Sequence, residues 1–118
     1  MPAPSAAPAN PLELDPLQLE TLAILQALAA EPAFADPPDA EGTVRIRALP
    51  HAHGDHVHIG RFLVLARNAT GLANPNVYNV LAREGLILAG PAGEPVLTAR
   101  GLAYETGIAE RILHRSEH

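Results

Sequence analysis

The sequence contains no cysteine, no tryptophan and no lysine, and only 3% of its residues are aromatic. Without cysteine, neither a disulfide nor a thiolate metal site can form. No apolar run approaches the roughly 20 residues that a transmembrane helix needs. The N-terminal stretch MPAPSAAPANP also lacks the basic and then apolar order of a signal peptide. We therefore expect a cytoplasmic protein that makes no contact with a membrane.

The charge is unevenly distributed along the 118 residues, which have a formal total of −5. Residues 1–41 carry seven acidic side chains and no basic one, which gives −7. Residues 42–118 carry all eight arginines and six acidic side chains, which gives +2. The overall acidity argues against non-specific binding of nucleic acid, but the second part can still form a basic face.

The length suits a single domain. Residues 1–11 are rich in Pro and Ala and are expected to form a disordered tail, which leaves residues 12–118 for the domain. Leucines at helical intervals predict a helix over 12–30, and Asp15 and Pro16 supply its N-cap and its first-turn proline.

The rest of the chain predicts an α+β fold. In TVRIRAL, apolar residues alternate with arginines, which predicts a half-buried strand over 43–48. The apolar pattern of HIGRFLVLARNA predicts a helix over 57–68, and the Asn-Pro start of NPNVYNVLARE predicts another over 74–84. A Gly- and Pro-rich turn predicts a hairpin over 86–98, and a last helix is expected over 102–115. Together these elements give four helices and a small three-stranded antiparallel sheet.

Residues 62–101, FLVLARNATGLANPNVYNVLAREGLILAGPAGEPVLTARG, resemble the winged helix-turn-helix of bacterial transcription regulators. The resemblance is to the multiple-antibiotic-resistance and phenolic-acid repressor types. The segment LARNATGL resembles the first helix of the motif with its turn. The segment NPNVYNVLAREGLI resembles the recognition helix and the entry to the wing. The segment VLTARG resembles the end of the wing. The sequence departs from the family in a shorter recognition helix and in Glu94, which stands at the wing tip where regulators commonly place a base.

The resemblance implies a DNA-binding transcription regulator that acts as a homodimer. In such a regulator the flanking helices, here 12–30 and 102–115, bury their apolar sides in the dimer interface, and the partner is double-stranded DNA. The alternative from the residues alone is that these helices pack on their own domain.

Helix 74–84 is chemically suited to reading bases. Asparagine can form a bidentate pair with adenine and arginine with guanine in the major groove, and the side of the helix away from Val77 and Leu81 carries both residue types. Arginines on the preceding helix are candidates for phosphate contacts. The candidate DNA-binding residues are Arg61, Arg67, Asn74, Asn76, Tyr78, Asn79 and Arg83. The open alternative is that the asparagines only start the helix and that Arg83 is a solvated charge.

The segment HAHGDHVH concentrates imidazoles at one place in the chain. Imidazole and carboxylate groups bind zinc and other divalent transition metals, so the segment is a candidate metal site. Its candidate ligands are His51, His53, Asp55, His56 and His58. The alternative is a solvated connection in which Asp55 caps the helix predicted over 57–68.

HAHGDH also matches, letter for letter, the His-x-His-x-Asp-His signature of metallo-β-lactamase-like hydrolases. The layered fold of that family needs a much longer chain and a second set of ligands. We therefore expect no enzyme and no resident cofactor. Any metal is expected to be weakly held, because its ligands would come from one flexible segment that loses conformational entropy on binding.

Two further functions stay open beside DNA binding. One is a winged-helix module that binds another protein and no DNA, which the net acidity and Glu94 favour. The other is a metal-binding protein that uses the histidine segment.

Overall fold

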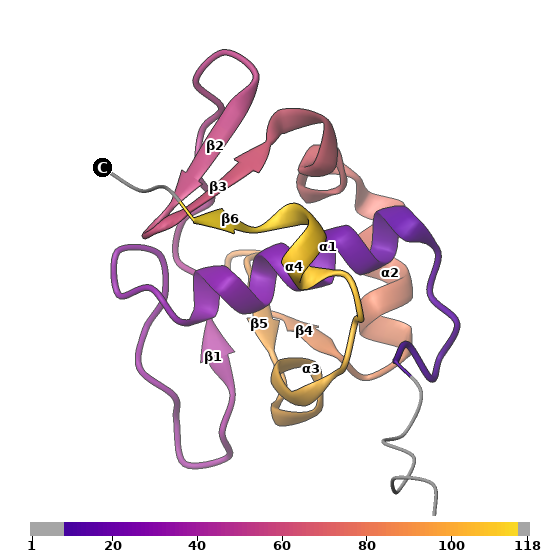
Figure 1. Ribbon diagram of the computed structural model, residues 1–118. Coiled ribbons are helices and arrows are strands. Elements are labelled where there is room, and N and C mark those ends of the chain that lie inside the picture. Colours follow the sequence, from indigo (N-terminus) through magenta and orange to yellow (C-terminus); the bar gives the residue numbers. More distant parts are fainter. Residues whose placement is uncertain (1–8, 116–118) are drawn as a thin grey trace, which may run out of the picture.

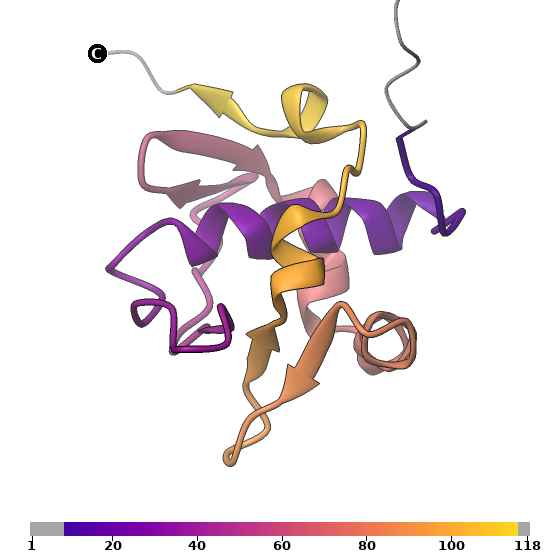
Figure 2. The same ribbon diagram turned by 90° about the horizontal axis from the view of Figure 1, so that it is seen from below.

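The computed structural model describes residues 9–115, which form an α+β fold of four α-helices and two small three-stranded antiparallel sheets (Figure 1). Helix α1 (Pro16–Ala29) crosses the middle of the molecule. Figures 1 and 2 show one hairpin, β2 (His56–Ile59) and β3 (Phe62–Leu65), on one side of α1, and the other, β4 (Ile87–Ala89) and β5 (Pro95–Leu97), on the opposite side. The predicted class is confirmed, although two sheets replace the single one expected. No helix within residues 9–115 is long and apolar enough to cross a membrane.

Helix α1 begins at a reciprocal N-terminal cap. The Asp15 carboxylate accepts a hydrogen bond from the backbone N–H of Gln18 at 2.8 Å, and the Gln18 side chain accepts one from the backbone N–H of Asp15 at 3.0 Å. Pro16 takes the first helical position, where its missing N–H costs nothing. The helix predicted over 12–30 is therefore confirmed, with a later start.

The first sheet joins β1 (Val44–Arg45) to the β4–β5 hairpin in the order β1-β5-β4. Both pairs are antiparallel, and Leu97 of β5 lies opposite Val44 on one side and Ile87 on the other. These three side chains are buried and make the inner face of the sheet. The strand predicted over 43–48 is confirmed in a shorter form, and the hairpin predicted over 86–98 is confirmed.

The helix predicted over 57–68 is wrong, because this segment forms the β2–β3 hairpin. Val57 and Ile59 are buried and alternate with His56 and His58, which point the other way. This is the period of a strand. The apolar residues of β3 fit a helical period as well as a strand period, and the prediction chose the helical one.

A two-residue turn closes the β2–β3 hairpin. Gly60 takes a φ of 56° in this turn, which suits the first central position of a type II′ turn. Strand β6 (His114–Arg115) pairs with the other edge of β3, with His114 opposite Leu63. The second sheet thus has the order β2-β3-β6.

Two short 3-10 turns, η1 (Ala66–Asn68) and η2 (Thr70–Ala73), follow β3 where the resemblance implies the first α-helix of a helix-turn-helix. Helix α2 (Pro75–Arg83) comes next. The side chain of Asn74 caps it by accepting a hydrogen bond from the backbone N–H of Asn76 at 2.9 Å. The helix predicted over 74–84 is thus confirmed, and the α-helix predicted before it is not.

The C-terminal helix predicted over 102–115 is wrong as well. The chain is divided there between α3 (Ala99–Ala103), α4 (Ala109–Ile112) and β6. Gly107 lies between the two helices with a φ of 77°, a left-handed conformation that a continuous right-handed helix excludes.

The tail predicted over residues 1–11 is ordered where the structure describes it, and residues 1–8 lie outside the described residues. The backbone N–H of Asn10 donates to the carbonyl oxygen of Glu105 at 2.6 Å. The side-chain oxygen of Asn10 accepts a hydrogen bond from the Tyr104 hydroxyl at 2.6 Å. These bonds hold the chain around residue 10 on the domain.

The apolar side of α1, predicted to lie in a dimer interface, is already covered within one chain. α1 contacts η1, η2, α2, α3, α4 and β5. Four of its large side chains have no exposed surface: Leu22, Ile24, Leu25 and Leu28. The apolar side of α1 therefore packs on its own domain, which was the alternative to an interface at 12–30 and 102–115, and a homodimer stays a prediction.

Candidate nucleic-acid interface

Helix α2 has one buried and one exposed side. Val77 and Leu81 are buried in the core, and at about 100° per residue Asn79 points in the opposite direction. Asn76 and Arg83 lie within about 60° of Asn79 around the helix axis, and all three are exposed. These three residues, called the α2 stripe below, present two amides and one guanidinium to solvent.

Two other predicted DNA contacts, Asn74 and Tyr78, also have structural roles. Asn74 supplies the helix cap. The half-buried Tyr78 hydroxyl donates to the carbonyl oxygen of Leu72 at 2.7 Å, and burial raises the pKa of the Tyr78 phenol. This bond ties α2 to η2, so the side-chain oxygen of Asn74 and the Tyr78 hydroxyl already have partners within the chain.

The two predicted phosphate contacts, Arg61 and Arg67, are exposed but lie on different elements. Arg67 lies in η1, on the segment that leads into α2. Arg61 lies in the turn of the β2–β3 hairpin, so its predicted place on a helix is wrong. The four residues of β3 separate this turn from η1 by about 13 Å. The structure therefore keeps Arg67 close to the path into α2 and places Arg61 at the far end of the hairpin.

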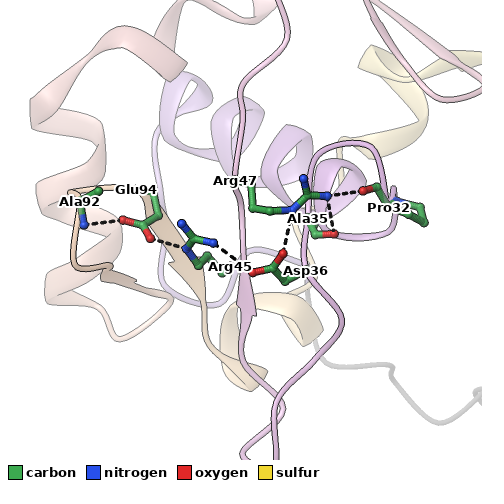
Figure 3. Close-up of polar contacts among 7 residues, drawn as sticks. All are labelled: Pro32, Ala35, Asp36, Arg45, Arg47, Ala92 and Glu94. Atoms are coloured by element: carbon green, nitrogen blue, oxygen red, sulfur yellow. Dashed lines mark hydrogen bonds and ion pairs between the residues drawn. The ribbon is translucent and has the colours of Figure 1, made fainter.

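The charge of Glu94, near the tip of the β4–β5 hairpin, is balanced by Arg45 of β1. The Glu94 carboxylate accepts a hydrogen bond from the Arg45 guanidinium and another from the backbone N–H of Ala92, the latter at 2.8 Å (Figure 3). The hydrogen bond from Arg45 holds the pKa of the Glu94 carboxyl below its ordinary range. Glu94 is therefore an ion-paired carboxylate and not an isolated negative charge on the hairpin.

Sequence reasoning missed the network to which this ion pair belongs. Figure 3 shows the Asp36 carboxylate between the guanidinium groups of Arg45 and Arg47, at 3.1 Å and 2.7 Å. Arg47 also donates to the carbonyl oxygens of Pro32 and Ala35, the latter at 3.2 Å. The network joins the loop after α1 to the first sheet. Its only sequence signal was the alternation of two arginines with apolar residues, because the partners are remote along the chain.

A cleft of about 480 Å³ lies between α2, the segment 45–49 and the β4–β5 hairpin. Its lining includes Leu49 and Leu88, which are 36% and 52% exposed. Asn79 of the α2 stripe also borders the cleft. Concave apolar surfaces of this size suit a small molecule or a short peptide segment. No local sequence pattern signals this cleft, because its walls come from three separate segments.

The structure brings three of the four clustered histidines together. His53 and His56 form a β-bridge across a tight turn, with the backbone N–H of His53 donating to the carbonyl oxygen of His56 at 2.8 Å. The rings of His56 and His58 meet edge to face with centres 4.8 Å apart, and the ring of His53 lies 6.4 Å from that of His58. His51 precedes the turn, and within residues 9–115 no ring contact joins it to these three.

Asp55 does not cap a helix, because a strand follows it. Its carboxylate Oδ1 lies 3.3 Å from His56 Nδ1, and its carbonyl oxygen accepts a hydrogen bond from the backbone N–H of Ala66 at 2.7 Å. In the described part of the chain, no three His, Asp or Glu side chains are positioned to hold one metal ion as they stand. A bound ion would require the imidazoles to turn toward one another.

Neither known protein families, nor characterised proteins, nor solved structures match this chain. The chemistry of its own surfaces is therefore the guide to its function.

Proposed function

We propose that the chain binds double-stranded DNA through the α2 stripe and acts as a transcription regulator. The observation that carries the proposal is the shared exposure of Asn76, Asn79 and Arg83 on a helix that Val77 and Leu81 fix in the core. The two amides can pair with adenine and the guanidinium with guanine in the major groove. A helix has the width to enter that groove.

The order of the elements supports a winged helix-turn-helix arrangement. Helix α2 is followed at once by the β4–β5 hairpin, which takes the place of the wing, and β1 joins the same sheet in the order β1-β5-β4. The turns η1 and η2 stand where the first helix of the motif is expected. The bond from Tyr78 to Leu72 holds η2 against α2 in the way that a packed helix would. The β2–β3 hairpin is then an addition between β1 and η1.

Arg67 is the proposed phosphate contact, since it is exposed on the segment that leads into α2. Phosphate contacts position a protein on the duplex without reading its sequence. A homodimer would supply a second α2 for a palindromic site, and its interface would lie outside the buried side of α1. A regulator of this kind would work in the cytoplasm.

The first test is a fluorescence anisotropy titration of the full chain with random duplex DNA at low and at moderate salt. Affinity should fall steeply as salt rises, because phosphate contacts release counterions. A chain that binds no duplex at low salt would refute the proposal.

The second test separates base reading from backbone contact. A preferred duplex is selected from a random library, and Asn79→Ala and Arg83→Ala are compared with wild type on it. Each substitution should cost about 1–3 kcal/mol on the preferred duplex and little on random DNA. Arg111→Ala, at an exposed arginine of α4, is the matched control. It should change neither the affinity for the preferred duplex nor that for random DNA. Equal losses on both kinds of DNA would leave non-specific binding only.

A protein- or peptide-binding function of the cleft is the second candidate. The exposure of Leu49 and Leu88 in one cleft favours it, and so does the net charge of −5. If wild type binds no duplex but selects apolar peptides from a library, and Leu88→Ser abolishes that binding, this candidate replaces the first.

A further inference from the structure

The outer face of the second sheet carries imidazoles that the proposed function does not use. His56 and His58 are two positions apart on β2, so both side chains leave the sheet on the side opposite the buried Val57 and Ile59. His56 keeps 32% of its side chain exposed, and His58 is exposed. Both rings can therefore turn without disturbing the core.

His53 stands beside this pair because the chain folds back at Gly54. Gly54 has a φ of 66°, and reciprocal backbone hydrogen bonds of 2.8 Å and 3.4 Å join His53 and His56 across the turn. Residues paired in this way project their side chains from the same face. Three imidazoles thus share one small area of a paired, hydrogen-bonded backbone.

The spacing of the rings fits a metal ion. Two imidazoles on one tetrahedral zinc ion have ring centres about 5 Å apart, given Zn–N bonds of about 2.0–2.1 Å. The centres of the His56 and His58 rings are 4.8 Å apart, and those of His53 and His58 are 6.4 Å apart. The first pair already has the required spacing, and a rotation of the exposed His53 side chain would close the second.

Asp55 is placed to orient one of the ligands. Its carboxylate lies 3.3 Å from Nδ1 of His56, so a proton on Nδ1 points at Asp55 and the lone pair of Nε2 is left for a metal. A carboxylate behind a histidine ligand fixes the tautomer and the ring orientation in many metal sites.

We propose that His53, His56 and His58 bind one divalent transition-metal ion, of the class of zinc or nickel, on the outer face of the second sheet. Three imidazoles without thiolates suit these borderline ions and not magnesium or calcium, which prefer oxygen ligands. The expectation of weak binding assumed a flexible segment. The structure pairs this segment in a hairpin and so lowers the conformational entropy lost on binding. The inference does not depend on DNA binding, because it uses no residue of the α2 stripe.

The test is calorimetric titration of the full chain with zinc chloride and with nickel chloride. We expect one ion per chain with a micromolar or tighter dissociation constant. His56→Asn, His58→Asn and His53→Asn should each weaken binding at least about tenfold, since loss of even an outer-shell group typically costs that much. The temperature of unfolding should rise with metal for wild type and not for these variants.

His114→Asn and His51→Asn are the matched controls. His114 lies on the same outer face but one strand beyond Leu63, and His51 precedes the turn. Both variants should bind metal as wild type does. The proposal is wrong if no heat is released up to millimolar metal, if His53→Asn leaves binding intact, or if the controls lose as much affinity as His56→Asn. Circular dichroism of each variant checks that the hairpin substitutions leave the fold in place.

Discussion

The two sheets on either side of α1 have similar inner faces and different outer faces. Leu97 of the first sheet and Ile59 of the second have no exposed surface, so each sheet is attached to the core by aliphatic packing. On the outer face of the first sheet, arginines are paired with carboxylates from other segments. The outer face of the second sheet carries imidazoles, and the carboxylate of Asp55 lies beside the imidazole of His56.

This difference separates structural polar groups from groups that are available to a ligand. Arg45 and Arg47 donate to partners within the chain, and they hold the β4–β5 hairpin and the loop after α1 in place (Figure 3). His53 and His58 have no side-chain hydrogen bond to another described residue. A bound ion would give the imidazoles the partners that the guanidinium groups already have.

The largest expected effect tests whether the inner faces are equivalent. Leu97→Ala and Ile59→Ala should each lower the free energy of unfolding by about 2–5 kcal/mol, because each removes a fully buried side chain and leaves a cavity. Urea unfolding of the full chain measures both. A cost below about 1 kcal/mol for Ile59→Ala alone would mean that the second sheet is only loosely attached.

Two glycines, one packed against the first sheet and one in the turn before the second, should differ in the stability lost on substitution by alanine. A Cβ at Gly101 would lie 1.9 Å from the carbonyl oxygen of Leu86, whereas a Cβ at Gly54 would meet nothing within 4 Å. Gly101→Ala should therefore cost about 3 kcal/mol or more through overlap with the backbone. Gly54→Ala should cost only about 1–2 kcal/mol for the left-handed conformation at a φ of 66°. Thermal unfolding of the two variants gives the order, and the reverse order would contradict the close approach of α3 to the first sheet.

A smaller effect, on the salt dependence of DNA affinity, compares Arg67 in η1 with Arg61 in the turn of the second sheet. Arg67→Ala should weaken binding to all duplexes alike and lower the slope of log affinity against log salt by about one. Arg61→Ala should leave the slope unchanged, since Arg61 lies at the far turn of the hairpin. Anisotropy at four salt concentrations measures both slopes. A larger change for Arg61→Ala would place the hairpin turn, and not η1, on the duplex.

The smallest effect concerns the ion pair on the first sheet. The pKa of Glu94 is lower in the folded chain than its ordinary value, so its pairing with Arg45 stabilises the fold fully above the ordinary carboxyl pKa. This contribution is lost as the pH falls through the lowered pKa. The difference in urea midpoint between wild type and Glu94→Gln should therefore shrink on acidification, and Arg45→Ala should behave like Glu94→Gln. A difference in urea midpoint that grows as the pH falls would mean that folding raises the pKa of Glu94 and does not lower it.

Elements with local start and stop signals were predictable from the sequence. Asp15 with Pro16 marked α1, and Asn74 with the following proline marked α2. The alternating arginines marked β1, and the Gly- and Pro-rich turn marked the β4–β5 hairpin. In each case a side chain satisfies the end of its own element or sets its period, so few residues decide the structure.

The second sheet and the charged network were not predictable, for two physical reasons. The apolar run after Gly60 fits both helical and strand periods, and only the glycine turn, with its φ of 56°, decides between them. The pairing of Arg45 with Glu94 and the bond from Tyr78 to Leu72 depend on tertiary placement. The α2 stripe was predictable because a helix fixes its own angular positions.

The most direct test of the central claim is amide chemical-shift mapping of the ¹⁵N-labelled full chain as a preferred duplex is added. DNA binding through the α2 stripe predicts that the largest shift changes fall on residues 76–84, with smaller ones at Arg67 and at residues 92–94 of the β4–β5 hairpin, and little change over 53–62. Largest changes over 53–62, or no changes at a duplex concentration that saturates the anisotropy signal, would contradict it.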